Sequence, residues 1–438
     1  MKIKADKALS PFFLEGWSIS KDTWFDIEYV DARQFLKPER IDLVSKLMYI
    51  DCRERNVDNT YAKKIYSEYI KAFSLGTYTE PGNENKNSLE KYFYSFDKLI
   101  DSIHHDGLLA DKSVVPVGEN NSILDGSHRT AIAIYYGMKL PIIRIHNIEK
   151  NYNYEFFKDR GMDEVYLEQT VMKYIEFSEQ CYVACLWPRG KGNQERQKAE
   201  ELLRREASIV YKKEIRFNYN GITQLMVHIY GNQKWAGNLE NGFAGIYNKS
   251  KECYDYRNST VIYILQGCDL QKIIKLKEQI RGIFGVENHS IHITDTKQEA
   301  IDASKMLLNH NSVELMNYGD IIKPTKIIKK ILDEYDNQSC KIISQDVTKI
   351  LFGILNESEE HSIWNNSENF FDPYKYGYVY GIKFLGLENC ELTVYEKMKY
   401  FIKKIRYGAI ANCIKRINIK RRIRHLGGVI LRKIKIIR

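Results

Sequence analysis

Residues 113–145 read SVVPVGENNSILDGSHRTAIAIYYGMKLPIIRI and decide the fold of the first part of the chain. Two short apolar segments, 113–117 and 122–125, flank the turn-forming GENN. A helical segment, SHRTAIAIYY, follows and ends at Gly137, and LPIIRI is a third apolar segment. Strands that alternate with a helix over so short a distance predict a compact α/β domain that ends near residue 150.

The turn between the second strand and the helix has the features of a phosphate-binding site. Gly126 lets the backbone turn tightly, and the first helical residues present unpaired N–H groups to an anion. His128 and Arg129 add charged donors for phosphate oxygens, and Asp125 can hold Mg²⁺ or orient a substrate hydroxyl. On the five residues alone, a simple β-turn capped by Asp is the alternative. The expected cofactor-binding residues are Asp125, Gly126, Ser127, His128, Arg129 and Thr130.

The order of apolar strand, variable turn, strand, Asp-Gly-x-His-Arg, helix and strand resembles the ParB/sulfiredoxin superfamily over about residues 80–147. This superfamily includes CTP-binding chromosome-partitioning proteins, ATP-dependent sulfiredoxins and kinases that phosphorylate free serine. The resemblance implies that the turn binds ATP or another nucleoside triphosphate. Sulfiredoxins place a catalytic Cys where this chain has Ser127, and a hydroxyl cannot perform thiol-based sulfinic chemistry. Residues 150–320 show no helix-turn-helix DNA reader, which disfavours the partitioning branch.

The kinase branch of the superfamily implies a catalytic base upstream of the motif. Glu80 or Glu84, in the turn-rich YTEPGNENKNS, lies at the comparable place. Either carboxylate could accept the proton of a substrate hydroxyl while Asp125 and Mg²⁺ balance the phosphate charge. The catalytic candidates are therefore Glu80, Glu84 and Asp125, and each glutamate could instead be part of a solvated turn.

Two basic residues are candidates for contact with the substrate. Lys86 follows the two glutamates, and Arg40 begins the helical pattern PERIDLVSKLMYID. Asp42 and Lys46 in the same pattern stand at i and i+4, where an exposed helix forms an ordinary ion pair. We expect these two to be structural unless they face the cleft.

The remainder of the chain continues the α/β pattern. Residues 151–320 read as a second, mixed α/β domain, with strands expected at 182–188 and 225–231. Residues 321–395 are similar to nucleotidyltransferase-like domains that accompany ParB-like domains in bacterial surface-glycan clusters. The Asp-x-Asp of those domains is missing here, and Glu359, Glu360 and His361 stand in its place. The similarity therefore implies a degenerate region that binds the acceptor.

Two further sets of residues in the second domain could bear chemistry. His289 and His292 would point to opposite faces of a regular strand, and they could share a metal with Asp295 only if His289 lay in the preceding turn. The second set could line an acceptor pocket or belong to the core, and it comprises Trp187, Arg189, Lys191, His228, Tyr230, Trp235 and Lys249.

Positive charge is concentrated at the C-terminal end. The 42 residues from Lys397 to Arg438 hold 15 Lys and Arg and no acidic residue, which leaves 51 basic against 57 acidic residues elsewhere. Apolar residues fall at helical spacing between these charges, at Met398, Phe401, Ile402, Ile405 and Ala409 among others. Residues 396–438 therefore predict a basic amphipathic helix suited to an anionic membrane surface. Packing on the acidic body is the alternative, and nucleic acid is a less favoured ligand because it requires no regular Ile.

Composition indicates where the protein acts. The eight cysteines form no Cys-x-x-Cys pair, the first residues lack the apolar run of a signal peptide, and no run of 18 apolar residues occurs. We expect a cytoplasmic bacterial protein, peripheral at the inner face of the membrane. Its expected function is transfer of phosphate from a nucleotide to a hydroxyl of a small molecule or surface-polysaccharide precursor. The alternatives are a nucleotidyl- or glycosyl-phosphate transferase that uses residues 180–390, and a ParB-like nucleotide or DNA binder.

Overall fold

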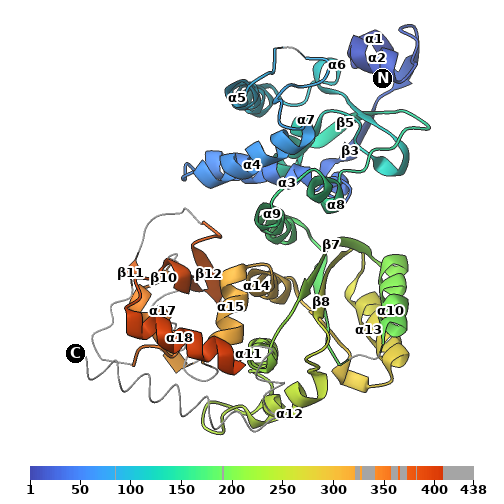
Figure 1. The fold of residues 1–438 in the computed structure, drawn as a ribbon. Coiled ribbons are helices and arrows are strands. Elements are labelled where there is room, and N and C mark those ends of the chain that lie inside the picture. Colours follow the sequence, from blue (N-terminus) through green and yellow to red (C-terminus); the bar gives the residue numbers. More distant parts are fainter. Residues whose placement is uncertain are drawn as a thin grey trace. The chain divides into compact units, whose positions relative to one another are not determined.

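The computed structural model describes residues 1–83, 85–189, 192–320, 326–327, 341–356, 364–365, 372–380 and 382–407. The fold is mixed α/β, with 54% helix, 15% strand and several small sheets, which confirms the expected class. The chain divides into two compact units, residues 1–178 (unit 1) and residues 179–438 (unit 2) (Figure 1).

Unit 1 is built on a three-stranded sheet in the order β3-β5-β4. Strands β4 (Val115–Val117) and β5 (Lys139–Arg144) are parallel and are joined by helix α7 (Ser127–Tyr136), whereas β3 (Glu28–Asp31) pairs with β5 antiparallel. The strand expected at 122–125 is only an isolated bridge between Ile123 and Val117, because a 3-10 turn at Glu119–Asn121 already reverses the chain. The expected strand–turn–helix–strand frame around residue 126 is otherwise present.

Residues 1–40 contain several regular elements. Strand β1 (Lys2–Lys4) pairs with β2 (Trp24–Asp26), and helices α1 (Ala5–Ala8) and α2 (Pro11–Gly16) lie between them in the chain. A 3-10 helix, Ala32–Phe35, follows β3. Apolar side chains of this segment share one core with the region of the main sheet. Ile3, Leu9 and Leu14 pack there with Val114 and Ile143.

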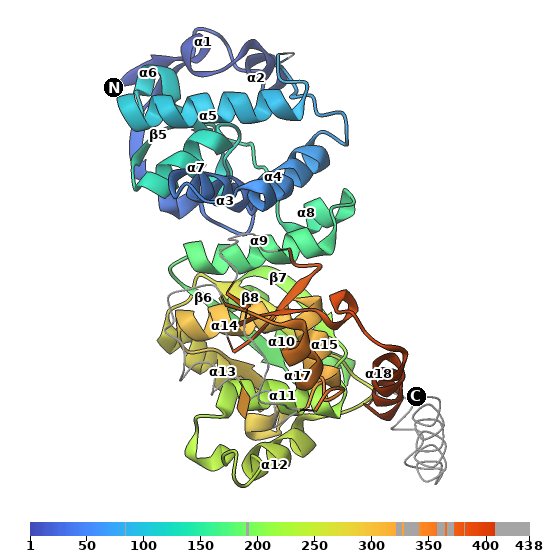
Figure 2. The same ribbon diagram turned by 90° about the vertical axis from the view of Figure 1, so that its left-hand side faces the viewer.

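Helices surround α7 in unit 1. Helices α3 (Asp42–Glu54) and α5 (Leu89–Asp106) both contact it, and α4 (Thr60–Phe73) packs on α3 (Figure 2). Ser88 caps α5, since the Ser88 hydroxyl accepts a hydrogen bond from the Lys91 N–H. A short helix, α6 (Ala110–Ser113), leads into β4.

The first unit extends past the boundary expected at residue 150. Helices α8 (Tyr154–Asp159) and α9 (Glu164–Phe177) belong to it. The Tyr174 hydroxyl donates to the Leu36 carbonyl at 3.0 Å, and the Phe157 ring packs against Tyr69 with centroids 4.5 Å apart. These buried contacts continue the core of unit 1 to Ser178.

Unit 2 contains a four-stranded antiparallel sheet in the order β7-β8-β6-β9. The strands are β6 (Cys181–Leu186), β7 (Ser208–Ile215), β8 (Thr260–Gln266) and β9 (Ile291–Ile293). Helix α10 (Asn193–Glu206) joins β6 to β7, and α13 (Leu270–Phe284) joins β8 to β9. Two interlocked β-α-β units result, with both helices on one face of the sheet (Figure 1).

Residues 225–230 belong to helix α11 (Tyr219–Tyr230), which ends at Gly231, and not to the strand that we expected at 225–231. Asn218 caps this helix by accepting a hydrogen bond from the Gly221 N–H, and the buried Ile222, Leu225 and Met226 follow helical spacing. The apolar run LMVHIY by itself does not distinguish a strand from a buried helix. Elements near α11 are η3 (Lys234–Ala236), α12 (Ala244–Cys253), η4 (Glu287–His289), α14 (Lys297–Leu307) and α15 (His310–Tyr318).

A second sheet of unit 2 lies in the region expected as a separate domain, 321–395. Its order is β11-β10-β13-β12. Leu315 of α15 shares a core cluster with Phe352, Val379 and Phe384, so this region packs on the preceding helices. Glu359, Glu360 and His361 lie outside the described residues. The elements are β10 (Lys341–Ile343), α17 (Gln345–Leu351), β11 (Trp364–Asn365), β12 (Tyr376–Val379), β13 (Ile382–Leu385) and η5 (Leu387–Asn389).

The basic C-terminal segment begins with helix α18 (Val394–Tyr407), and residues 408–438 lie outside the described part of the chain. Lys404 forms an ion pair of 2.8 Å with Glu314 of α15, and Lys399 donates to the Ile354 carbonyl at 3.1 Å. The described part of this segment thus packs on the rest of unit 2. Such packing is the alternative to a membrane-facing helix that we considered from the sequence. No helix among the described residues is long and apolar enough to cross a membrane.

Candidate phosphate-binding site

The turn that precedes α7 requires glycine. Gly126 has a φ of 82°, in the left-handed region, and a Cβ there would lie 2.8 Å from Val115 Cγ2 and 3.0 Å from Arg129 Nη2. The Thr130 N–H donates to the Gly126 carbonyl at 3.0 Å, which starts the helix, and no side chain caps that start. The first turn of α7 therefore presents its N–H groups and the positive end of the helix dipole to a ligand.

Arg129 ties this turn to β4. Its Nη1 donates to the Val114 carbonyl at 2.9 Å, and its Nη2 lies 3.2 Å from Asp125 Oδ2. A guanidinium has five N–H donors, so these two bonds leave three for other acceptors. Arg129 can both hold the turn and donate to a phosphate.

His128 lies among aromatic rings. Its Nε2 is 2.5 Å from the Tyr66 hydroxyl, and its ring meets Phe96 edge-on with centroids 4.7 Å apart. Burial, with the nearby charges of Lys46 and Lys86, holds the pKa of His128 well below its usual 6.5. The imidazole is therefore neutral at pH 7, in contrast to the charged donor that we expected from the sequence.

A buried triad of charges lies next to the turn. Asp42 is fully buried and accepts hydrogen bonds from Arg40 Nε at 2.8 Å, Arg40 Nη2 at 2.9 Å and Lys46 Nζ at 2.9 Å. Arg40 also donates from Nη1 to the Ile123 carbonyl, 2.8 Å away, in the segment that leads into the turn. Asp42 and Lys46 are therefore not the exposed pair that i, i+4 spacing suggested.

The triad carries a net positive charge. Burial alone would raise the pKa of Asp42, but Arg40 and Lys46 outweigh it and hold that pKa well below 3.8. With the carboxylate ionised and both partners charged, the sum is +1. Lys150 adds a further cation, since its Nζ lies 3.4 Å from the Leu124 carbonyl and interacts with Asp125. Neither Lys150 nor Tyr66 was identified from the sequence, because both reach the turn through tertiary contacts.

The loop before α5 brings Glu80 and Lys86 to the same region. Glu80 Oε2 lies 3.1 Å from Lys86 Nζ and 3.2 Å from Asn83 Nδ2. The negative charge of Glu80 is one of the causes, after burial and Tyr92, that raise the pKa of Tyr66. Glu80 is therefore near the partner of His128, although it is paired with Lys86. Glu84 lies outside the described residues.

Comparisons with protein-family models, with curated proteins and with solved structures find no match to this chain. Among the described residues, no group of three or more His, Cys, Asp or Glu side chains is arranged to hold a metal ion. Asp125 alone, with a phosphate, remains the candidate ligand for Mg²⁺.

Several residues named from the sequence of unit 2 meet at one cavity. His228, Tyr230, Trp235 and Lys249 line it. His289 lies in η4, the turn before β9, so it and His292 line the same cavity and do not face away from each other. Asp295 also lines it.

The other three residues of that predicted set do not line this cavity. Trp187 is fully buried in the core, and Arg189 forms an ion pair of 2.8 Å with Glu252. Lys191 lies outside the described residues. Four of the seven residues of that set therefore line the cavity.

Proposed function

We propose that unit 1 is a ParB/sulfiredoxin-type domain that binds the phosphates of ATP or another nucleoside triphosphate at residues 125–130. We further propose that the protein transfers phosphate to a hydroxyl of a small molecule or surface-glycan precursor. The observation that supports this most is the gathering of cations around the uncapped start of α7. Arg40, Lys46 and Lys86 all lie close enough to influence the charges there.

Asp42 and Glu80 supply two negative charges against the three positive charges of Arg40, Lys46 and Lys86, so one positive charge is left uncompensated in this group. A helix start carries roughly half a positive charge, and cations beside it are repelled. Arg40 and Lys46 are each at most 5% exposed, so solvent screens them little. A phosphate bound to the helix N–H groups would reverse the sign of these interactions, because each cation would then attract it.

The proposed reaction uses two carboxylates. The substrate oxygen attacks the terminal phosphorus, the new O–P bond forms, and the bridging P–O bond breaks so that nucleoside diphosphate leaves. Glu80 accepts the hydroxyl proton, and Asp125 with Mg²⁺ balances charge on the phosphates. The pairing of Glu80 with Lys86 allows this role only if substrate displaces Lys86 toward the phosphates.

A second candidate function is supported by the cavity of unit 2. Its histidines and lysines could serve a nucleotidyl- or glycosyl-phosphate transferase that uses residues 180–390. This function would need no residue of the turn at 125–130. Loss of activity in His292→Ala with full activity in Arg129→Ala would favour it.

The role of Glu80 can be tested by product analysis. The full chain is incubated with Mg-ATP or Mg-CTP and a panel of hydroxylated acceptors, and nucleoside diphosphate and phosphorylated product are measured. We expect Glu80→Gln to retain nucleotide binding and to lose roughly 10²- to 10⁴-fold in turnover. Glu90→Gln, an exposed change at the start of α5, should leave turnover unchanged. Turnover that is equal in Glu80→Gln and the unchanged protein would exclude Glu80 as the base.

A further inference from the structure

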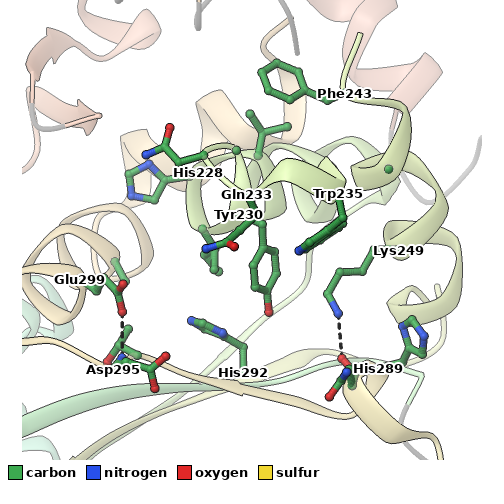
Figure 3. A pocket seen from close by; sticks show the side chains of 18 of the residues that line it. His228, Tyr230, Gln233, Trp235, Phe243, Lys249, His289, His292, Asp295 and Glu299 are labelled. Atoms are coloured by element: carbon green, nitrogen blue, oxygen red, sulfur yellow. Dashed lines mark hydrogen bonds between the residues drawn. The ribbon is translucent and has the colours of Figure 1, made fainter. Parts of the chain in front are cut away.

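A cavity of unit 2 takes no part in the proposed phosphate chemistry. It has a volume of about 1220 Å³ and is lined by the end of α11, by α12, η4, β9 and α14. Figure 3 shows the side chains of Tyr230, Lys249 and His292 pointing into the same space from three different elements. Nothing in the turn at 125–130 takes part in it, so any ligand here would define a separate site.

The alternation of strand β9 places His292 in this cavity. Ile291 and Ile293 belong to the core between the sheet and helices α10 and α13, so the residue between them faces the other side. There His292 meets Tyr230, whose ring lies edge-on with centroids 5.2 Å apart. The sheet thus supplies a rigid floor for a polar group.

The histidines of the cavity are neutral at pH 7. Burial lowers the pKa of His228 to about 4 and that of His292 to about 3, and Lys277 contributes to the second shift. Burial lowers the pKa of His289 as well. A neutral imidazole has one donor and one acceptor nitrogen, which matches the hydrogen-bonding pattern of a hydroxyl group.

Two buried polar atoms of the cavity have no hydrogen-bond partner within the described part of the chain. They are His228 Nδ1 and Arg281 Nε. Leaving such an atom unsatisfied costs about 1–3 kcal/mol, more when the group is charged. Both residues line the cavity. The Arg281 guanidinium requires an acceptor, and an anionic one would suit it best.

An aromatic platform lies beside these polar groups. The rings of Tyr230 and Trp235 have centroids 5.3 Å apart, and Lys249 Nζ lies 5.2 Å and 5.8 Å from them. Trp235 is 48% exposed although it is a large apolar side chain. An exposed ring face bordered by a cation is suited to a ligand that has an apolar face and a negative charge.

The cations differ in their availability. Lys277 is ion-paired with Asp295, and Lys249 Nζ donates to the Asn288 carbonyl at 2.8 Å. An ammonium group has three N–H donors, so Lys249 retains two. Arg281 and Lys249 are therefore the cations that could receive an anionic group.

We infer that this cavity binds an anionic carbohydrate, either a sugar phosphate or a uronic acid. The sugar ring lies on Trp235 and Tyr230, its hydroxyls bond to His228 and His292, and its anionic group meets Arg281 and Lys249. Neutral imidazoles recognise hydroxyls, ring faces recognise the C–H face of the sugar, and the two cations select a charged sugar over a neutral one. This inference does not depend on the phosphate site of unit 1.

Isothermal titration calorimetry of the full chain without nucleotide tests this inference. The probes are glucose 6-phosphate, glucuronate, glucose and inorganic phosphate. We expect at least one of the two charged sugars to bind at least 10-fold more tightly than both glucose and inorganic phosphate. Binding of glucose 6-phosphate would identify the anionic group as a phosphate, and binding of glucuronate would identify it as a carboxylate. Equal binding of glucose, or binding of inorganic phosphate as tight as that of the sugar, would overturn the inference, and so would the absence of binding by every probe.

Matched variants place the ligand in the cavity. Arg281→Gln and Trp235→Ala should each weaken binding of the charged sugar about 10-fold, or roughly 1.4 kcal/mol. The controls are Lys275→Gln, exposed on the same helix as Arg281, and Trp24→Ala, which is 59% exposed in unit 1. Variants that bind like their controls would overturn the assignment. Because no assay contains nucleotide, failure here leaves the proposed function of unit 1 untouched.

Discussion

Arg40 donates two hydrogen bonds to Asp42, from Nε at 2.8 Å and from Nη2 at 2.9 Å, at a place that solvent hardly reaches. Two parallel bonds fix the guanidinium plane. The third donor of Arg40 holds the Ile123 carbonyl, so the pair connects α3 to the segment before the turn. The position of the proposed phosphate site therefore depends on this buried pair.

Asp42→Asn should destabilise unit 1 by about 3–5 kcal/mol, because it leaves Arg40 and Lys46 buried without their counter-charge. Denaturant unfolding measures the loss. Asp51→Asn is the matched control, since Asp51 forms an i, i+4 ion pair with Arg55 on the same helix but at its surface. That change should cost no more than about 1 kcal/mol. Equal costs for the two variants would contradict the buried triad.

Gly126→Ala should destabilise unit 1 by more than Gly137→Ala. Both glycines have left-handed backbones, with φ of 82° and 66°. A Cβ at residue 137 would meet nothing within 4 Å, so only the backbone cost of about 1–2 kcal/mol applies there. At residue 126 the Cβ would also collide with Val115 and Arg129. If thermal unfolding shows the two variants to be equally stable, the close packing of the turn is wrong.

Acid should destabilise unit 2. The pKa values of His228 and His292 are lowered by folding, to about 4 and about 3, so below pH 6.5 the unfolded chain binds protons that the folded chain does not. The contribution of these two histidines to the free energy of unfolding is fully present above pH 6.5. It decreases as the pH falls toward 4, by at most about 1.4 kcal/mol per pH unit for each histidine.

Urea unfolding between pH 7 and pH 4 measures this dependence. His228→Asn and His292→Asn should each flatten the slope, whereas His310→Asn, at an exposed position, should not. A slope that is the same in all three variants would show that these histidines titrate normally.

Deletion of residues 408–438 should preserve unit 2, because α18 and its contacts with Glu314 and Ile354 remain. These residues contain most of the basic charge of the C-terminal segment. Sedimentation with anionic liposomes should show binding by the full chain and loss of it in the deletion. Unchanged liposome binding with loss of duplex DNA binding would instead favour the nucleic-acid alternative.

The sequence predicted the parts of the fold whose signals are local. Strand β4, the turn at Gly126 and the apolar periodicity of α7 lie close together in the sequence. The short elements of residues 1–40 could not be predicted locally, because they are stabilised by a core that includes Ile143, far away in the chain. Residues 225–231 were misread because the decisive cap, Asn218, lies outside the apolar run.

The candidate site was predictable to a similar degree. The turn was predicted from its five residues together with the strands and helix expected around them, and Arg40 and Lys86 were candidates by their charge. The burial of Asp42 with Lys46 could not be predicted, since i, i+4 spacing occurs in exposed and buried pairs alike. The neutral state of His128 follows from Tyr66, Phe96 and two lysines brought together only by the tertiary fold.

A test of nucleotide-dependent stabilisation requires a variant of the phosphate site that remains folded. Arg129→Ala should remove it but also breaks the bond to the Val114 carbonyl, so its effect combines two causes. Lys86→Gln is a milder change, because this side chain is partly exposed and the interaction that is lost is its ion pair with Glu80. Lys91→Gln, exposed on α5, is the matched control.

The most direct test of the phosphate site is thermal unfolding of the full chain with and without Mg-ATP and Mg-CTP. We predict that one of them raises the melting temperature of unit 1. At a nucleotide concentration 100-fold above the dissociation constant, the free energy of unfolding should increase by about 2.7 kcal/mol. Lys86→Gln should reduce this increase and Lys91→Gln should not. If neither nucleotide stabilises the protein, or if the two variants respond alike, residues 125–130 do not bind nucleotide phosphate as proposed.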